Sequence, residues 1–510
     1  MKLNKNKFTI MNNASIVPLK EIPILPVEDF MRTILDCVEK SQRIISYFGT
    51  PAENPDTTLL YVIITDDENN KFYTGRTEIK GDSFTSLTPK CPQVHLFERE
   101  IAEQFGLKPI GHPWLKPLRY IRSSNERDAW NRTAGETILP AVGDFYRVEG
   151  EQVHEVAVGP VHAGIIEPGH FRFQCNGEQV MHLEIALGFQ HRGVEEAMIG
   201  GPDNKSLHYM ETLSGDTTIG HTSTYCQIIE ALSNTNKSYR AQVLSGIALE
   251  LERLANHVGD LGALSGDVGF LPTASFCGRI RGDFLNLTGL LCGNRFGRGF
   301  IKPGGLGSDV DQIVVDDILK KLNILEKETK DAIELLWNNQ SVMARFEDTG
   351  LLTQQQAIEL GVVGVAARAT GLIRDARFNH PSGIFRFFQM HVCTVDSGDV
   401  FARAYVRWLE IQQSIDFITK QIKSLPGGTI TAVSNVLKNE SISVAINEGW
   451  RGEICHAAIT DAKGKFLRYK IVDPSFHNWY ALALAVRNQE ISDFPLCNKS
   501  FNLSYCGHDL

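Results

Sequence analysis

The chain has 510 residues, of which 43% are hydrophobic and 22% are charged, a composition typical of a folded protein with several domains. Its net charge of −9 and the lack of a long basic block argue against a nucleic-acid partner. No run of about 18 apolar residues predicts a transmembrane helix, and the basic start lacks the apolar segment of a secretory signal. The ten cysteines form no C-x-x-C pair, which favours reduced thiols over a disulfide framework.

The first part of the chain predicts a small α+β domain. Residues 27–49 carry apolar side chains at helical spacing, and LLYVIITD (59–66) is an apolar strand followed by a turn cluster. Residues 71–79 alternate like a hairpin partner, and a later helix stops at Gly106. The expected segments are a flexible start at 1–24, an α+β domain at 25–120, a linker at 121–149 and a second domain at 150–510.

The second domain is expected to be mainly helical, with a small β-sheet at its start. VHEVAVGPVHAG and HFRFQCNGEQVMHLEIALG look like strands around a loop. Three long segments then repeat apolar residues with the helical period, at 238–269, 316–338 and 400–425.

Motifs in both domains resemble subunits of respiratory complexes. E-R-E (98–100), F-G (105–106) and G-H-P (111–113) resemble the 30-kDa-type hydrophilic subunit of complex I. GPVHAGIIEPGHFRF (159–173) and HRGVEE (191–196) resemble the large subunit of membrane-bound NiFe hydrogenases of the formate hydrogenlyase and hydrogenase-4 type, and its cousin, the 49-kDa-type quinone-pocket subunit of complex I. Further motifs follow in the same order: ELERLANHVGD, NRFGRGFIKPGG, TGLIRDARFNHP, GDVFARAYVR and RYKIVDPSF. The resemblance implies the fold of that large subunit, fused here to the small one.

The nickel-binding positions of the resembled hydrogenases carry no cysteine in this chain. The family holds nickel with four thiolates, because soft sulfur suits nickel and low-spin iron. The two motifs fall at ETLSGDTTIGH (211–221) and VDPSFHN (472–478). The four positions are Ser214, Thr217, Ser475 and Asn478. We therefore expect no metal at these positions and no hydrogen cleavage by this chain, an energy-converting hydrogenase-related version without the nickel cysteines.

Several polar side chains should line the vacated cavity. By motif position they are His162, Asp216, His221, Asp473 and His477. Carboxylates and imidazoles in a sheltered cleft shift each other's pKa values and could load and release protons. In complex I the cavity takes a quinone head group held by a His and a Tyr; His162 stands at the His position, but the Tyr position falls at or near Leu213.

Other interpretations of these residues stay open. Asp216 could cap a helix and Asp473 could close a turn, or a single metal ion such as zinc could bind to Asp216, His221 and His477.

Two further segments carry expectations from the resemblance. Arg374, Asp375 and Arg377 resemble residues that face the cofactor side of the large subunit; a buried ion-pair network is the alternative. The tail SDFPLCNKSFNLSYCGHDL (492–510) replaces the segment that hydrogenases lose during nickel loading. We expect it to stay on the protein as a strand or extended arm that lines an interface.

The resemblance implies a peripheral large subunit of a membrane-bound, complex-I-like oxidoreductase. It would couple electron transfer, with a quinone as one candidate acceptor, to proton or ion translocation at the cytoplasmic face of the inner membrane. No cofactor is expected on this chain; an iron–sulfur cluster is expected in a small partner subunit, beside antiporter-like and quinone-channel-like membrane subunits. The alternative is a non-redox scaffold that couples antiporter-like subunits.

Overall fold

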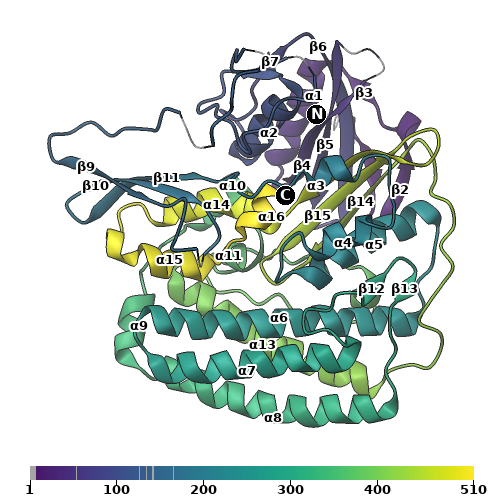
Figure 1. Cartoon of the computed structure of the whole chain (residues 1–510), viewed down its shortest axis with the longest axis vertical. Helices are drawn as coiled ribbons and strands as arrows, with labels where there is room; N and C mark the ends of the chain where they lie inside the picture. Colours follow the sequence, from purple (N-terminus) through teal and green to yellow (C-terminus); the bar gives the residue numbers. More distant parts are fainter. Residues whose placement is uncertain are drawn as a thin grey trace, which may run out of the picture.

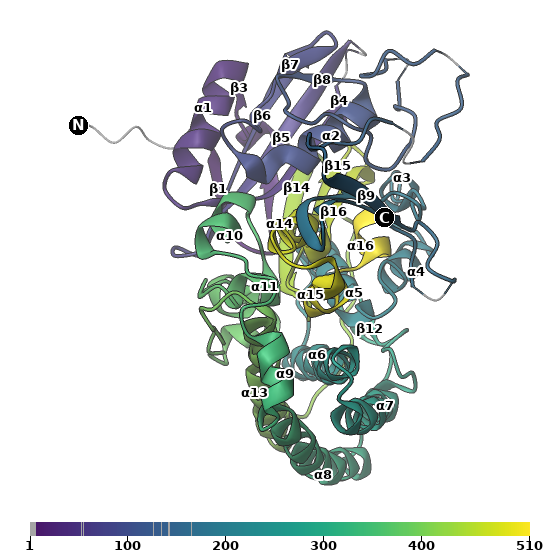
Figure 2. The same cartoon turned by 90° about the vertical axis from the view of Figure 1, so that its left-hand side faces the viewer.

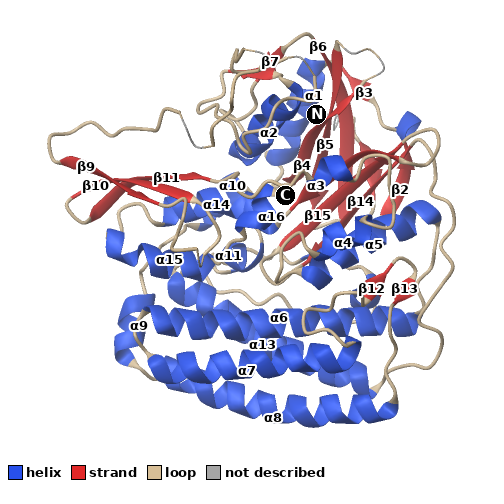
Figure 3. Cartoon of the chain, in the orientation of Figure 1, coloured by secondary structure: helices blue, strands red, loops and turns tan. Residues whose placement is uncertain are grey.

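The computed structural model describes residues 7–510, apart from residues 53, 55, 126, 134, 141, 142 and 165. A small α+β part lies at one end, a layer of long helices at the other, and a second sheet lies between them (Figure 1, Figure 3). Within the described residues, no helix is long and apolar enough to cross a membrane. All ten cysteines are free, in agreement with their scattered spacing.

The small part is a five-stranded sheet covered by two helices. Its strands run in the order β1-β6-β5-β4, and β3 pairs parallel to β6. The segment 27–49, whose spacing is helical, divides: α1 ends at Val38, and Arg43 begins β4, because RIISYFG is rich in β-branched and aromatic residues. The elements are β1 (Thr9–Met11), β3 (Ile24–Leu25), α1 (Val27–Val38), β4 (Arg43–Pro51), β5 (Thr57–Asp66), β6 (Lys71–Lys80), β7 (Ser83–Thr85), α2 (His95–Phe105) and β8 (Lys108–Ile110).

The first residues are not the flexible start that their sequence suggests. From residue 7 on, the segment contributes β1 to the small sheet and β2 (Ser15–Pro18) to the sheet of the large part, where Val17 pairs with Ile442. Residues 1–6 lie outside the described residues. Strands of three or four residues are too short to show an alternating sequence pattern. β1 and β2 form because they pair with the edge strands β6 and β14 (Ser441–Glu448), which are distant in the sequence. The described residues of 121–149 form no helix or strand, as expected of a linker.

Among the described residues the large part contains three sheets, one of them the two-stranded β12-β13, whereas the sequence predicts one. The sheet at its start, in the order β11-β10-β9, projects from the body (Figure 1). The sequence analysis did not predict the second sheet, in the order β16-β15-β14-β2, whose strands β14 and β15 are buried along their whole length. The strands are β9 (Val153–Val158), β10 (His170–Asn176), β11 (Gln179–Ala186), β12 (Ile301–Lys302), β13 (Gly305–Leu306), β14 (Ser441–Glu448), β15 (Glu453–Thr460) and β16 (Phe466–Val472).

Four long helices form the layer farthest from the small part (Figure 2). The helical periodicity predicted three of them closely, as α6 (Tyr239–Asp267), α8 (Gln312–Trp337) and α13 (Val400–Lys423); the fourth is α7 (Leu271–Cys292). The remaining helices are α3 (Val194–Ala197), α4 (Ser206–Glu211), α5 (Thr218–Ser233), α9 (Gln340–Phe346), α10 (Gln354–Leu360), α11 (Gly364–Arg368), α12 (Ala376–Asn379), α14 (Pro474–Ala485), α15 (Phe494–Phe501) and α16 (Tyr505–Asp509). Short 3-10 turns lie at Leu19–Glu21, Pro92–Val94, Gly383–Arg386 and Ile491–Asp493.

The small part and the second sheet share one hydrophobic core. Phe97 of α2 and Phe48 of β4 belong to the same buried cluster as Ile442, Val472 and Phe476 of the large part. The second sheet therefore packs against the small part on one side, while α5 covers it on another. The two motifs of the vacated centre end up at the start of α5 and directly after β16.

Candidate functional site

The two motif loops meet at the first turns of two helices. Thr217 directly precedes α5, and Asp473 caps α14 by accepting a hydrogen bond from the backbone N–H of Ser475 at 2.8 Å. Asp followed by Pro474 is a favourable helix start, because the side chain satisfies a free N–H and proline has none to satisfy. The helix-cap interpretation of Asp216 is wrong, because Thr217 holds the capping position of α5. Asp473, for which a turn was the alternative, caps α14.

The four former nickel positions are occupied by internal hydrogen bonds. Ser214 Oγ donates to Asp216 at 3.0 Å, and Thr217 Oγ1 donates to the same carboxylate at 3.0 Å. Asn478 makes two hydrogen bonds of 3.0 Å with the backbone of Val363, one from its amide nitrogen and one to its oxygen. Three hydroxyls and an amide committed to such partners do not fit a nickel–iron centre, which requires thiolates.

The C-terminal tail fills the space between these positions. The tail forms two short helices, α15 and α16, and not the expected strand or extended arm. Ser504, between them, hydrogen-bonds Ser214 Oγ at 3.0 Å, and its N–H donates to Ser475 Oγ at 2.8 Å. Gly507 lies so close to Asp473 that a Cβ there would stand 2.7 Å from the carboxyl carbon. The tail thus joins the two motif loops where a metal joins them in the resembled hydrogenases.

The carboxylate of Asp216 belongs to an ion pair with Arg451. The guanidinium donates to both carboxylate oxygens, at 2.6 and 2.8 Å. Burial raises the pKa of this carboxyl, but the charge and hydrogen bonds of Arg451 outweigh it and lower the pKa to about 2. Asp216 therefore stays ionised at neutral pH, and proton uptake has to use other groups.

His221 connects Asp473 to two residues that the sequence analysis did not select. His221 Nε2 lies 3.0 Å from Asp473 Oδ2, and Nδ1 lies 3.2 Å from His456 Nε2. His456 Nδ1 in turn lies 2.9 Å from the hydroxyl of Tyr469. All four side chains are at most 1% exposed. A signal for Tyr469 exists in the sequence: it lies four residues before Asp473 in the same motif, in the strand that ends directly before Asp473.

The other predicted site residues lie outside this cluster. His162, in the loop between β9 and β10, is hydrogen-bonded through Nε2 to the carbonyl of Gly169 at 2.9 Å. Leu213, at the position of the quinone-binding tyrosine, is fully buried in the core. His477 packs edge-on against Phe97 of the small part, and burial lowers its pKa to about 3. The structure thus joins His221 directly to Asp473 and separates His162 and His477 from them.

Asp375 and Arg377 are held in a buried ion-pair network. Arg377 donates to Asp375 at 2.6 Å and to Glu250 at 3.0 Å. Arg374 donates to the carbonyl of Val362, and the cavity beside it is about 10 Å³, the size of one water molecule. The ion-pair alternative therefore describes this segment, and the space next to it is too small for an organic cofactor.

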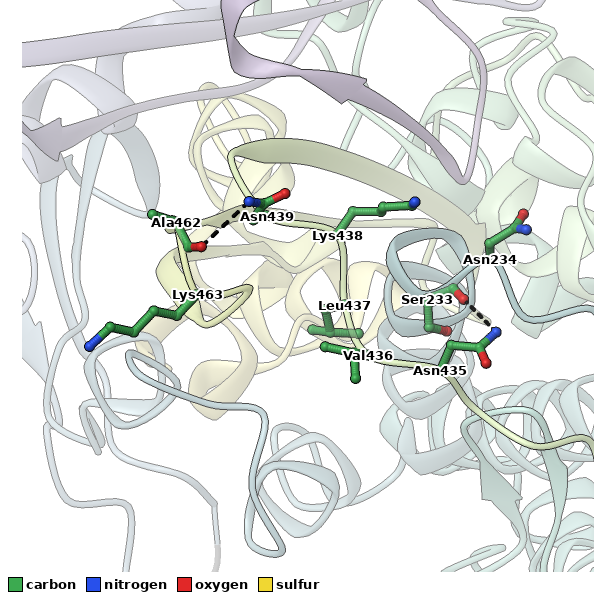
Figure 4. A pocket seen from close by; sticks show the side chains of 9 residues that line it. All are labelled: Ser233, Asn234, Asn435, Val436, Leu437, Lys438, Asn439, Ala462 and Lys463. Atoms are coloured by element: carbon green, nitrogen blue, oxygen red, sulfur yellow. Dashed lines mark hydrogen bonds between the residues drawn. The ribbon is translucent and has the colours of Figure 1, made fainter.

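Two larger cavities lie away from the centre. One, of about 510 Å³, is an open surface pocket lined by amides and by Lys438 and Lys463, whose ammonium groups point apart (Figure 4). The other, of about 1480 Å³, lies at the seam of the small and large parts, and His95, Tyr480 and His508 line it together with several aromatic rings. The cavity that touches Asp216 itself is about 10 Å³.

Comparison with known proteins agrees with the two-part architecture. Residues 28–126 match the family described as the 30 Kd subunit of respiratory-chain NADH dehydrogenase, and residues 267–443 match its 49 Kd subunit. Formate hydrogenlyase subunit 5 of Escherichia coli is 26% identical over 89% of this chain and 82% of its own length. The carbon monoxide-induced hydrogenase of Rhodospirillum rubrum is 29% identical over 68% of this chain and 97% of its own length. One component of the F(420)H(2) dehydrogenase of Methanosarcina mazei is 28% identical over 66% of this chain and 92% of its own length.

The fold, the collinear motifs and these matches define a subunit of an oxidoreductase complex. One polypeptide thus carries both a 30-kDa-type and a 49-kDa-type part, and its similarities are consistent with the membrane-bound hydrogenase and complex I family.

Proposed function

We propose that this chain is the peripheral large subunit of a membrane-bound, complex-I-like oxidoreductase that transfers electrons without a nickel–iron centre. The relatives are subunits of hydrogenases and of quinone- and F420-linked dehydrogenases by name, which favours a redox role over a purely structural scaffold. The single observation that carries the nickel-free part is the C-terminal Ser504, hydrogen-bonded to both Ser214 and Ser475 at former nickel positions.

The proposal includes partner subunits and a membrane site. An iron–sulfur small subunit would bring electrons to this chain, and antiporter-like and quinone-channel-like subunits would anchor it at the cytoplasmic face of the inner membrane. Electron transfer would be coupled there to proton or ion translocation. An iron–sulfur cluster would belong to the small subunit, because the ten cysteines here are scattered through the chain and nine of them carry a raised pKa from burial, which disfavours the thiolate that a cluster needs.

A quinone is the acceptor class to test first, but its place has to differ from the vacated centre. The tail fills that centre, and the adjoining cavity holds about one water molecule. The seam cavity of about 1480 Å³ is large enough for a quinone head group and part of its tail, and its walls are mainly aromatic and aliphatic.

Purification of the tagged chain from membranes of its native host tests the proposal. We expect a complex that contains an iron–sulfur protein, shows a cluster signal in electron paramagnetic resonance after reduction, and contains nickel far below one atom per chain. Stoichiometric nickel would overturn the nickel-free part. A complex without an iron–sulfur partner, or one in which no electron carrier is oxidised or reduced, would favour the scaffold.

A further inference from the structure

We propose that Tyr469, His456, His221 and Asp473 form a proton relay through the interior of the large part. The inference rests on the proposed function, since it names the route by which that subunit would move a proton. It adds two residues, His456 and Tyr469, to those that the family motifs single out. The four side chains come from four elements: β15 and β16 of the second sheet, the start of α14 and helix α5.

The hydrogen bonds of this chain all run in one direction. The hydrogen bond from His221 and the charge of Arg451 keep the buried Asp473 ionised, so its oxygen only accepts, and Nε2 of His221 carries the proton. His221 Nδ1 is then bare and accepts from His456 Nε2. His456 Nδ1 is bare in its turn and accepts from the Tyr469 hydroxyl. In this arrangement each imidazole gives one donor and one acceptor to its neighbours, which is the arrangement that lets a proton hop along a chain.

One proton can cross this chain without creating a buried charge. When a proton reaches the Tyr469 oxygen, its own hydroxyl proton passes to His456 Nδ1. His456 Nε2 then releases its proton to His221 Nδ1, and His221 Nε2 releases its proton to Asp473. One proton has entered and one has arrived, the carboxylate is neutral, and both imidazoles have exchanged tautomers. No electron moves in these steps.

The far end of the relay approaches the surface. The ring of Tyr225 lies 6.2 Å from that of Tyr469, and Tyr225 is hydrogen-bonded to Ser206. Ser206 Oγ donates to the exposed carboxylate of Asp203 at 3.0 Å. The near end, Asp473, touches Gly507 of the tail inside the vacated centre. The hydrogen-bonded relay thus runs from Tyr469 to Asp473 at the vacated centre, and the rings of Tyr225 and Tyr469, 6.2 Å apart, lie between its far end and the exposed Asp203.

Burial favours the neutral forms of His456 and Tyr469. Besides burial, His221 lowers the pKa of His456 and Glu195 raises it. The pKa of Tyr469 is also raised by its neighbours Tyr225, Cys226 and Cys455. Burial lowers the pKa of His456 well below its usual value and raises the pKa of Tyr469 well above its own. A relay of neutral groups exchanges protons at constant charge, and we expect its rate to change little between about pH 6 and 8.

Two substitutions in the intact complex test the relay. H456Q removes the imidazole, and Y469F removes only the hydroxyl. We expect both complexes to assemble like the wild type, and redox-driven proton uptake into membrane vesicles, followed with a pH-sensitive dye, to fall about tenfold or more. Y61F is the matched control, because it deletes an equally buried hydroxyl, one bonded to Arg76 in the small part, and it should leave uptake unchanged. Wild-type uptake in both relay variants would overturn the proposal.

A second measurement separates the relay from the proposed function. Nuclear magnetic resonance of the full chain labelled with ¹⁵N-histidine should show His221 and His456 neutral and protonated at Nε2 at pH 7. Y469F should shift the Nδ1 resonance of His456 and leave the other histidines in place. Double protonation of either ring, or an unshifted His456, would overturn the relay even if the complex transfers electrons. A wild-type complex that transfers no electrons would instead overturn the proposed function.

Discussion

Two buried clusters in the large part, one around His221 and one around Glu410, are equally hidden from water and bonded in opposite ways. Glu410 accepts from Arg368 at 2.7 Å, from Arg253 at 3.4 Å and from His257 at 2.8 Å. His221 contacts one carboxylate and one neutral ring. The first cluster is built from fixed charges, and the second contains a single ionised group.

The difference decides what each buried histidine can do. Arg368 and its neighbours overcome burial and keep the pKa of Glu410 well below its usual value, so this carboxylate stays ionised at neutral pH. His257 bonds to this carboxylate through Nε2, but its Nδ1 has no hydrogen-bond partner within the described residues, so a chain of hydrogen bonds ends at His257. His221 has a proton donor on one side and an acceptor on the other. Burial alone therefore does not identify a functional histidine. The hydrogen-bond partners of each histidine decide whether it can pass a proton on.

The largest expected effect comes from breaking the charged cluster. R368M should lower the free energy of unfolding by about 3–5 kcal/mol, because it removes the buried guanidinium that bonds to both Glu410 and Glu448. Chemical denaturation of the purified chain measures this. R279M, which breaks an exposed pair with Glu328, is the control and should cost less than about 1 kcal/mol. Equal losses in the two variants would mean that the buried network contributes no more than a surface pair.

A second effect should come from overpacking the vacated centre. G507A places a methyl group 2.7 Å from the carboxyl carbon of Asp473, and we expect a loss of about 1–3 kcal/mol from the displaced tail. Thermal and chemical unfolding measure it. G278A is the control, since its Cβ meets no atom within 4 Å and lies inside helix α7, where alanine is the better helix former. A neutral G507A would show that the tail does not pack tightly on Asp473.

A smaller effect should come from removing the hydroxyl that joins the tail to the motif loop. S504A deletes the contact with Ser214 and the cap of α16, where Ser504 accepts from Gly507 N–H at 2.9 Å. We expect a loss of about 1 kcal/mol. Hydrogen exchange should become faster at 502–510 and stay unchanged in α13. S424A, at the exposed end of α13, is the matched control. Unchanged exchange in the tail would contradict the link.

The smallest effect concerns the pH dependence of the Asp216–Arg451 pair. The pKa of Asp216 falls from 3.8 to about 2 in the folded chain, so the pair stabilises the fold fully above pH 4 and loses this contribution as the pH falls through 2. The stability difference between wild type and D216N should be constant from pH 7 to 5 and shrink below pH 4. The side chain is about one-third exposed, so the difference will be modest. A difference that shrinks already near pH 6 would contradict this assignment.

Much of the fold could be predicted from local pattern. The periodicity of 238–269, 316–338 and 400–425 predicts α6, α8 and α13 closely. The start of α14 at Asp473 was not predicted, because the Asp-Pro pair was interpreted as a turn. The second sheet was not predicted, and its strands β14 and β15 are buried along their whole length, so no exposed polar face marks them. The two helices of the tail were not predicted, because α15 has eight residues and α16 has five, too few turns for a periodic pattern of apolar residues.

The candidate site divides in the same way. Asp473 and His221 were predicted as neighbours from motifs 252 residues apart, and the structure joins them. His456 carries no comparable signal, since a single histidine in an apolar strand is equally consistent with a core residue. The assignment of Arg374, Asp375 and Arg377 to a cofactor gave way to ion pairs, because the sequence shows the charges and not their partners.

What the sequence alone determined was the chemistry that the vacated centre lacks: hydroxyl and amide side chains stand where thiolates would be needed, and no folding changes the softness of a ligand atom. What only the tertiary structure decided was what took the place of the metal. Ser504 meets Ser214 across 290 residues, and His221 meets His456 across 235, because the second sheet, α5 and the tail pack on one another. Contacts between residues so far apart in the sequence depend on how the elements pack. The local sequence of one element does not indicate which other element it will contact.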